Sequence, residues 1–355
     1  MKMEPKTPMN TVLQTLGFYL FGFGSRRKLL FQNNALKDAR NGEIIRQWDA
    51  VAHEVDASEY SVRLQMRDGR EVLLKEDESG VWLYENGERQ CLTAGDKVLL
   101  PRFENHPHSA ILRALHADIL VNIGEFGPVP NLWVYPKPWY RDAAMMAMVL
   151  KATGNLALLE KWILNLPREF DFNNNGHHEA DNPGQILYLL SLVTDSSHPM
   201  VPRVLDQVKL LQKDDYICGF TDYGERPVFQ TKWLKFGLQA LGLDDPYVVP
   251  ELYDRYSSLF WMDFRDQHVD GPRFNTHDST LYPYLRWAEA HFHNEAPPLH
   301  LLNARYPFTW EGAGSEAYYA GIEKVSPQLA AQRWCAPHTW HAAEAFLYLI
   351  EKTHR

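Results

Sequence analysis

The chain has 355 residues, of which 45% are hydrophobic and 23% charged, a balance typical of a folded protein that excludes wholesale disorder. Its 45 acidic and 36 basic side chains give a net charge of -9, which argues against nucleic acid and anionic membranes as partners. The three cysteines are odd in number and far apart, which excludes a disulfide framework and paired-cysteine zinc or redox motifs.

Residues 1–25 are predicted to form an N-terminal arm. The apolar run TVLQTLGFYLFGFG at 11–24 is shorter than the ~20 residues that span a bilayer. Basic residues follow it directly, without the small-residue cleavage site of a signal peptide. We therefore expect a cytoplasmic protein with no membrane partner.

Residues 26–106 are predicted to form a smaller antiparallel β domain. Two pairs of alternating segments mark its strands: SVRLQM with EVLLKE, and GVWLYE with ERQCL. Asp68-Gly69 joins the first pair and Asn86-Gly87 the second. These dipeptides favour type I′ turns because they accept the positive φ angles that such turns require.

Residues 107–355 are predicted to form a mainly α-helical catalytic domain. Apolar residues now recur with a period of 3.6, and about ten helices with short links follow one another. An economical arrangement is a closed ring of helical hairpins with an inner and an outer layer, and the apolar run ILYLLSLV (186–193) fits an inner helix. An irregular α-solenoid is the alternative, although no constant repeat length supports it.

The first candidate site segment opens a helix with an aromatic run. In NLWVYPKPWYRDAAMM, Trp139 and Tyr140 lead into Arg141 and Asp142. Aromatic faces pack against sugar rings, and an Arg-Asp pair binds hydroxyls through charge-assisted hydrogen bonds. The structural alternative is that Asp142 only stabilises the helix start.

The second segment, DFNNNGHHEADNPGQILYLL (171–190), is a long polar loop before an apolar helix. It contributes Glu179 and Asp181 as candidate catalytic carboxylates and His178 as a candidate ligand contact. Simple helix capping needs one such residue rather than a run of this length. His177 and His178 are adjacent instead of spaced for one helix face, so we predict no metal site and no cofactor.

The third segment lies near the C-terminal end of the chain. Trp310 and Glu311 precede Glu316 across two glycines in WEGAGSE, and a separate helix start, HTWHAAEAF, carries Trp340. Phosphate-binding glycine loops and the GxSxG elbow do not occur in the sequence. Carboxylates on separate loops suit glycoside hydrolysis, in which one carboxyl protonates the leaving oxygen and another activates water.

Three segments together resemble the six-hairpin (α/α)6-toroid glycosidases, most nearly the glucoamylase-like group. These are WYRDAAMMAMVLKATGN, EADNPGQILYLLSL, and TWEGAGSEAYY followed by HTWHAAEAFLYL, within about residues 107–352. The resemblance implies that Arg141 and Asp142 hold sugar hydroxyls. It further implies that Glu179 is the general acid, with Asp181 the competing candidate, and that Glu311 or Glu316 is the base of an inverting hydrolase.

The expected partner is a carbohydrate substrate, and two other functions stay open. A sugar epimerase or isomerase would use histidines for proton transfer near neutral pH, and the chain has 15 of them. A carbohydrate-binding protein without catalysis would keep the aromatic and polar contacts but not the acid and base. Glu179 also precedes a helix start, whose dipole favours the ionised carboxylate and so opposes a role as acid.

Overall fold

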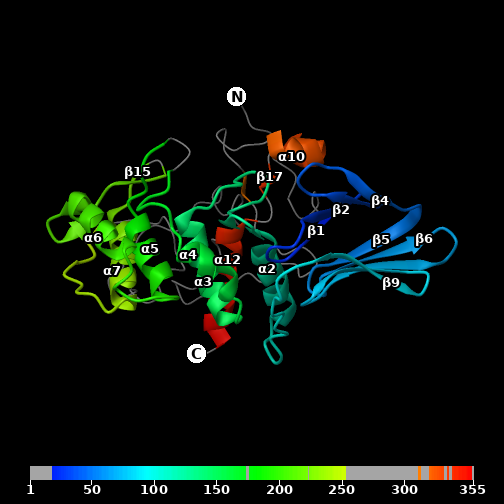
Figure 1. Cartoon of the computed structure of the whole chain (residues 1–355), viewed down its shortest axis with the longest axis horizontal. Coiled ribbons are helices and arrows are strands. Elements are labelled where there is room, and N and C mark those ends of the chain that lie inside the picture. Colours follow the sequence, from blue (N-terminus) through cyan, green and yellow to red (C-terminus); the bar gives the residue numbers. More distant parts are fainter. Residues whose placement is uncertain are drawn as a thin grey trace.

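The computed structural model describes residues 18–172, 176–222, 224–252, 311–312, 320–331, 334–335 and 338–353. It is elongated, with the larger β-sheets at one end and helices α5, α6 and α7 at the other (Figure 1). Helices α2, α3 and α12 lie between them. No helix in these ranges is both long enough and apolar enough to cross a bilayer.

The N-terminal region contains two antiparallel sheets whose strands follow sequence order. The first sheet consists of β1 (Phe18–Phe21), β2 (Leu29–Gln32), β3 (Ala35–Asp38) and β4 (Ile44–Gln47). The second consists of β5 (Ala50–Asp56), β6 (Ser61–Met66), β7 (Glu71–Glu76), β8 (Gly80–Glu85) and β9 (Glu88–Ala94). Strand β1 falls within the predicted N-terminal arm. The domain boundaries themselves stay predictions.

Both predicted hairpins are confirmed, as β6–β7 and β8–β9. Asn86 and Gly87 both have positive φ, +55° and +80°, as a type I′ turn requires. The first turn differs from the prediction, because Gly69 (φ +84°) has positive φ and Asp68 does not. The N–H of Gly69 donates to the carbonyl of Met66, so the chain reverses over a longer loop with glycine in the left-handed position.

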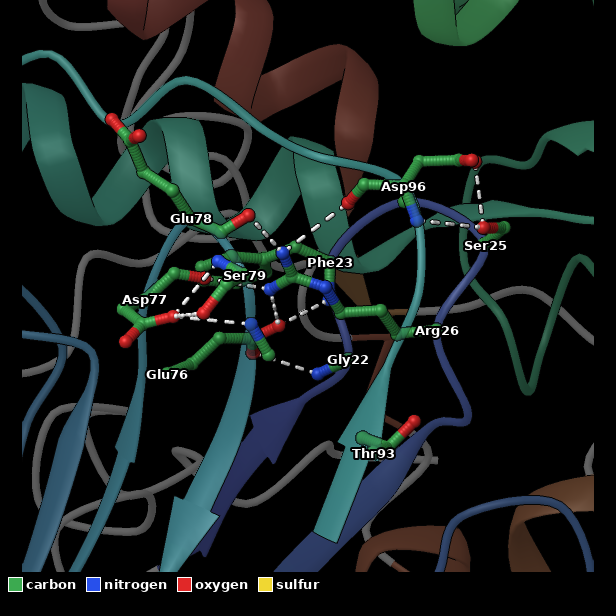
Figure 2. Close-up of polar contacts among 12 residues, drawn as sticks. Gly22, Phe23, Ser25, Arg26, Glu76, Asp77, Glu78, Ser79, Thr93 and Asp96 are labelled. Atoms are coloured by element: carbon green, nitrogen blue, oxygen red, sulfur yellow. Dashed lines mark hydrogen bonds and ion pairs between the residues drawn. The ribbon is translucent and has the colours of Figure 1, made fainter. Parts of the chain in front are cut away.

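A buried ion pair joins the two sheets. Nη1 of Arg26 lies 2.8 Å from Oε1 of Glu76 at the end of β7, and both side chains are fully buried. Glu76 also accepts the backbone N–H groups of Gly22 and Phe23, each at 2.7 Å (Figure 2). Lys28 extends this network toward the helices by donating to the carbonyl of Ile123 at 2.7 Å. A buried charge is tolerated only when paired and hydrogen-bonded in this way.

The helical region begins after residue 108. Its helices are α2 (Ser109–Val121), α3 (Tyr140–Ala152), α4 (Ala157–Ile163), α5 (Asn182–Ser191), α6 (Met200–Leu211), α7 (Pro227–Ala240), α10 (Ala320–Val325), α11 (Pro327–Ala331) and α12 (Thr339–Thr353). Two-stranded antiparallel sheets also occur in this region: β10–β11 (Ile123–Gly124, Gly127–Pro128), β12–β13 (Gln212–Lys213, Tyr216–Ile217), β14–β15 (Phe220–Thr221, Gly224–Glu225) and β16–β17 (Glu311–Gly312, Trp334–Cys335). Helix α12 packs against both α2 and α3, and α5 packs against both α3 and α7.

The prediction of a mainly α toroid is wrong, and so is the resemblance to the six-hairpin glycosidases. The structure combines antiparallel sheets with helices, and within the described ranges the helices do not close into a ring of six hairpins. Helical periodicity reports which face of a helix is buried, but it does not report which helices meet. The two-residue strands after residue 107 are also too short to produce an alternating pattern in the sequence.

Two glycines allow α5 and α7 to pack with their backbones in contact. A Cβ atom added at Gly184 would lie 2.2 Å from the backbone carbon of Trp233, and one at Gly237 would lie 2.3 Å from the carbonyl oxygen of Gly184. Only hydrogen fits at these two positions. The close contact fixes the start of α5 relative to α7, and the candidate site lies beside that start.

Candidate functional site

The N-terminal ends of α3, α5 and α12 meet in one buried polar cluster. Arg141 in the first turn of α3 reaches Asp181, the residue before α5. Thr339, the first residue of α12, donates to Oδ1 of Asp142 at 3.2 Å. Because a helix N-terminus carries partial positive charge and free N–H groups, this convergence favours carboxylates.

Arg141 is the centre of the cluster and pairs with three carboxylates from two segments. Its guanidinium pairs with Glu179, with Oδ2 of Asp181 at 3.0 Å and with Oδ2 of Asp222 at 3.2 Å. Its side chain is only 3% exposed. Burial alone would lower the pKa of Arg141, but the negative charges of Asp222, Asp181 and Asp142 outweigh it and raise that pKa above its ordinary value.

Asp181 is held rigidly by hydrogen bonds as well as by Arg141. Its Oδ2 accepts from Nε2 of Gln185 at 2.6 Å, and its Oδ1 accepts from the hydroxyl of Thr221 at 2.8 Å. The side chain has no exposure to solvent. Asp181 therefore orients Arg141 and the β14 segment, and solvent has no direct access to it.

Glu179 is equally enclosed. One carboxylate oxygen pairs with Arg141, and the other accepts the backbone N–H of Asp222 at 2.9 Å. Both contacts favour the ionised carboxylate. This arrangement suits a residue that positions Arg141 and the Asp222 turn better than it suits the predicted general acid.

Among the described carboxylates that pair with Arg141, Asp222 is the most accessible to solvent. Its side chain is 26% exposed, against 3% for Glu179 and 0% for Asp181. It lies in the turn between β14 and β15 with a φ of +51°, an uncommon conformation for a residue other than glycine. Such conformations persist where the surrounding structure enforces them, often at functional sites.

Asp171 is a fourth carboxyl near Arg141, and it has a strongly altered pKa. Its Oδ2 accepts the backbone N–H of Tyr140 at 2.6 Å. The residue keeps partial exposure to solvent, and most of its carboxyl group is surrounded by protein atoms. Burial raises the pKa of Asp171 to about 7, with the charge of Asp181 acting in the same direction and the Tyr140 hydrogen bond opposing them. Asp171 can therefore carry a proton near neutral pH.

The predicted aromatic residues divide between the cluster and its surroundings. The ring of Trp340 lies 5.3 Å from Cζ of Arg141, a cation–π distance. Trp139 packs against Tyr135 with ring centres 5.5 Å apart, and Tyr135 contacts His338. The hydroxyl of Tyr140 donates to the backbone carbonyl of Arg168 at 2.8 Å.

The histidine loop before Glu179 carries exposed stacked rings. His178 stacks on Phe170 with ring centres 4.7 Å apart and planes 6° from parallel. His177 stacks on Phe220 at 5.0 Å, and Phe220 is 47% exposed. Because Phe220 and Glu179 lie in segments joined by the Ala180 N–H to the Phe220 carbonyl, these rings flank the cluster.

A buried histidine pair lies at the start of α12. The rings of His338 and His341 are 4.5 Å apart, and both residues are buried. Burial lowers the pKa of His338, while the nearby charge of Asp142 opposes that change. His338 is therefore neutral near pH 7 and able to accept a proton.

The structure brings together most of the predicted site residues that it describes, from segments 141–142, 179–181 and 340. Trp310 and Glu316 lie outside the described residues, as does the side chain of Glu311. The backbone of Glu311 pairs with that of Cys335, and Cys335 precedes His338 by three residues. Sequence reasoning did not single out Asp171 or Asp222, although Asp171 begins the second predicted segment.

Within the described residues, no group of three or more His, Cys, Asp or Glu side chains is arranged to hold a metal ion. Comparisons of the chain with protein-family models, with curated proteins and with solved structures gave no match.

Proposed function

We propose that this cluster is the active site of a glycoside hydrolase in which Asp171 is the general acid and Asp222 the general base. The observation that carries the proposal is the environment of Arg141. It pairs with three carboxylates, one of them accessible, beside a fourth carboxyl that holds a proton near pH 7. Two carboxyl groups in different environments are what acid–base hydrolysis of a glycosidic bond requires.

The two roles follow from the two environments. Asp171 would donate its proton to the leaving oxygen as the C–O bond breaks. Asp222, partly exposed and fixed by Arg141, would take a proton from the attacking water. With water attacking the face opposite the leaving group, the anomeric configuration inverts. Glu311 and Glu316, between which the sequence left the base open, are the alternatives to Asp222.

The surroundings of the cluster fit a sugar ligand. Phe172 and Phe220 are 43% and 47% exposed, and rings of this kind pack against the C–H faces of sugars. Hydroxyl groups would meet the exposed edge of Asp222. Trp139 and Trp340, which were predicted as sugar contacts, are half-buried. Trp340 contacts Arg141 directly, whereas Trp139 contacts Tyr135.

The proposal is tested by screening the purified chain on aryl glycosides and oligosaccharides and assigning the first anomer released by NMR. Asp171→Asn should lower turnover of unactivated substrates by about 10²–10⁴-fold and spare substrates with an activated leaving group. Asp222→Asn should lower both. The matched control is Asp206→Asn, which also removes one negative charge but at an exposed position on α6. It should leave turnover of both substrate types unchanged.

Two outcomes would count against this assignment. If Asp171→Asn lowered turnover of unactivated and activated substrates equally, Asp171 would not be the general acid. Saturable sugar binding without any turnover would favour a carbohydrate-binding protein instead.

A sugar epimerase or isomerase is the second candidate, favoured by the His338–His341 pair. A neutral histidine close to Asp142 could take a proton from a carbon next to a carbonyl. This reaction would exchange that hydrogen with solvent. Deuterium incorporation from D₂O into recovered sugar, lost in His338→Gln, would therefore identify it, whereas hydrolysis leaves carbon-bound hydrogens in place.

A further inference from the structure

Asp181 lies where two buried chains of hydrogen bonds meet. Each chain begins at a backbone N–H group, passes through two polar side chains and ends at one of the carboxylate oxygens of Asp181. The side chains that form the chains come from α5, β14 and α7, and none is more than 1% exposed. They are Asn182, Gln185, Thr221 and Gln230.

The first chain begins at Asp171 and continues along the first turn of α5. The backbone N–H of Asp171 donates to Oδ1 of Asn182 at 2.9 Å, and Nδ2 of Asn182 donates to Oε1 of Gln185 at 3.0 Å. Nε2 of Gln185 then donates to Oδ2 of Asp181 at 2.6 Å. Because a backbone N–H can only donate, it fixes the orientation of the Asn182 amide, which in turn fixes that of Gln185.

The second chain begins at Gly219 and passes through α7. The N–H of Gly219 donates to Oε1 of Gln230 at 3.0 Å, and its carbonyl accepts from Nε2 of Gln230 at 2.8 Å, so both ends of that amide are fixed. Nε2 of Gln230 also donates to the hydroxyl oxygen of Thr221 at 2.9 Å. The one hydroxyl proton of Thr221 is therefore left to donate to Oδ1 of Asp181 at 2.8 Å.

Both oxygens of Asp181 consequently face donors. Oδ2 accepts from Nε of Arg141 at 3.0 Å in addition to Gln185. A proton on Asp181 would turn an O–H group toward a group that itself donates, which is unfavourable in a buried site. Reversing either chain to avoid this would only place an amide NH2 group against the backbone N–H at its start.

Asp171 is the neighbouring carboxyl that accepts a proton more easily. Its Oδ2 accepts the N–H of Tyr140, and no group in the described ranges donates to its Oδ1. Burial is the main cause that raises the pKa of Asp171 to about 7, and among the charged groups Asp181 and Asp142 raise that pKa while Arg141 lowers it. A negative charge fixed on Asp181 therefore favours the protonated form of Asp171.

We propose that Asn182, Gln185, Thr221 and Gln230 are positioning residues that keep Asp181 an unprotonated acceptor and so hold the proton of the cluster on Asp171. This inference rests on the proposed hydrolysis and assigns its proton. In each turnover the O–H bond of Asp171 breaks as its proton bonds to the leaving oxygen. Solvent then returns a proton to Asp171, while Asp222 releases to solvent the proton that it took from water.

The place of the proton can be measured without substrate, by NMR titration of the full chain labelled with carbon-13 at aspartate Cγ. The signals that are absent from Asp171→Asn and from Asp181→Asn identify the two carbons. We expect the Asp171 signal to shift as the pH passes through about 7. The Asp181 signal should stay at its carboxylate position from about pH 8 to 5.

Gln185→Met and Thr221→Val each remove one donor to Asp181 with little change in side-chain size. Each should increase protonation of Asp181 relative to Asp171 by about tenfold, and in the double variant both signals should shift over the same pH range. Thr221→Ser keeps the hydroxyl, and Gln90→Met makes the same exchange at an exposed position in β9. Both controls should titrate as the wild type does.

A kinetic measurement separates positioning from a general loss of structure. Gln185→Met should lower kcat on unactivated glycosides by about tenfold and spare substrates with an activated leaving group, whereas structural damage would lower both. The proposal is overturned if Asp181 titrates near pH 7 in the wild type, or if both signals titrate unchanged in the double variant. If the wild type turns over no glycoside, the hydrolase assignment fails, and the titration still decides whether these residues hold the proton on Asp171.

Discussion

Nε of Arg141 lies 3.0 Å from Oδ2 of Asp181, and the two side chains are 3% and 0% exposed. This contact ties the first turn of α3 to the residue before α5, two helices that also pack directly against each other. Burial removes the hydration that would stabilise either charge alone. The pair is therefore a structural requirement of the cluster as well as part of its chemistry.

Arg141→Met should lower the free energy of unfolding by about 3–5 kcal/mol, because it leaves Glu179 and Asp181 buried without a counter-charge. Urea unfolding at pH 7 measures the change. Arg67→Gln breaks a pair whose side chains are about three-quarters exposed and should alter stability by less than about 0.5 kcal/mol. A loss below about 1 kcal/mol in Arg141→Met would mean that the carboxylates regain solvent.

Gly184→Ala should destabilise the protein although it lies within a helix. Helix propensity alone would favour alanine by about 1 kcal/mol, so the sign of the effect is informative. The added Cβ would lie 2.2 Å from the backbone of Trp233, which requires α5 and α7 to separate. We expect a lower melting temperature, whereas Gly124→Ala, where the new Cβ meets nothing within 4 Å, should leave it nearly unchanged.

The elements that sequence reasoning predicted well are those with a local cause. Asn86-Gly87 specifies its own turn, and the apolar period from Ile111 onward specifies α2. The prediction of a closed ring of helical hairpins was wrong because ring closure depends on which helix faces meet. The contact between α5 and α7 depends on Gly184 and Gly237, 53 positions apart, and neither glycine carries a signal that names its partner.

The candidate site was partly predictable because polar residues at helix starts stand out against apolar runs. Arg141, Asp142, Glu179 and Asp181 all have this signature, and the structure places them together. Asp222 lacks it, since the two-residue strands on either side have no period to interrupt. Its part in the cluster arises from tertiary contacts with Arg141 and Glu179, which the sequence does not encode locally.

His116 should make the protein sensitive to acid. Burial lowers its pKa to about 3 in the folded state, against 6.5 when exposed. Between these values the unfolded chain binds a proton that the folded chain does not, so stability falls as the pH falls from about 6.5 to 3. The loss is on the order of 4–5 kcal/mol when complete. His116→Gln should flatten this part of the stability curve, and an unchanged slope would contradict the prediction.

Asp171 should have the opposite dependence on pH. Its pKa is about 7 when folded and 3.8 when exposed, so between these values the folded chain holds a proton that the unfolded chain has lost. Its contribution to stability is present below about pH 4 and is lost as the pH rises through 7. Asparagine can still accept the N–H of Tyr140, so Asp171→Asn isolates the titration from the hydrogen bond.

The stability of Asp171→Asn relative to wild type should therefore increase steadily from pH 4 to 7 in urea unfolding measurements and level off above 7. Under the proposed hydrolysis, the same proton is needed for turnover, and the kcat of the wild type should fall above about pH 7. The residual kcat of Asp171→Asn should not show this fall above about pH 7. Parallel stability curves for the two proteins would show that Asp171 ionises normally, and a general acid near neutral pH would then have to be sought elsewhere in the cluster.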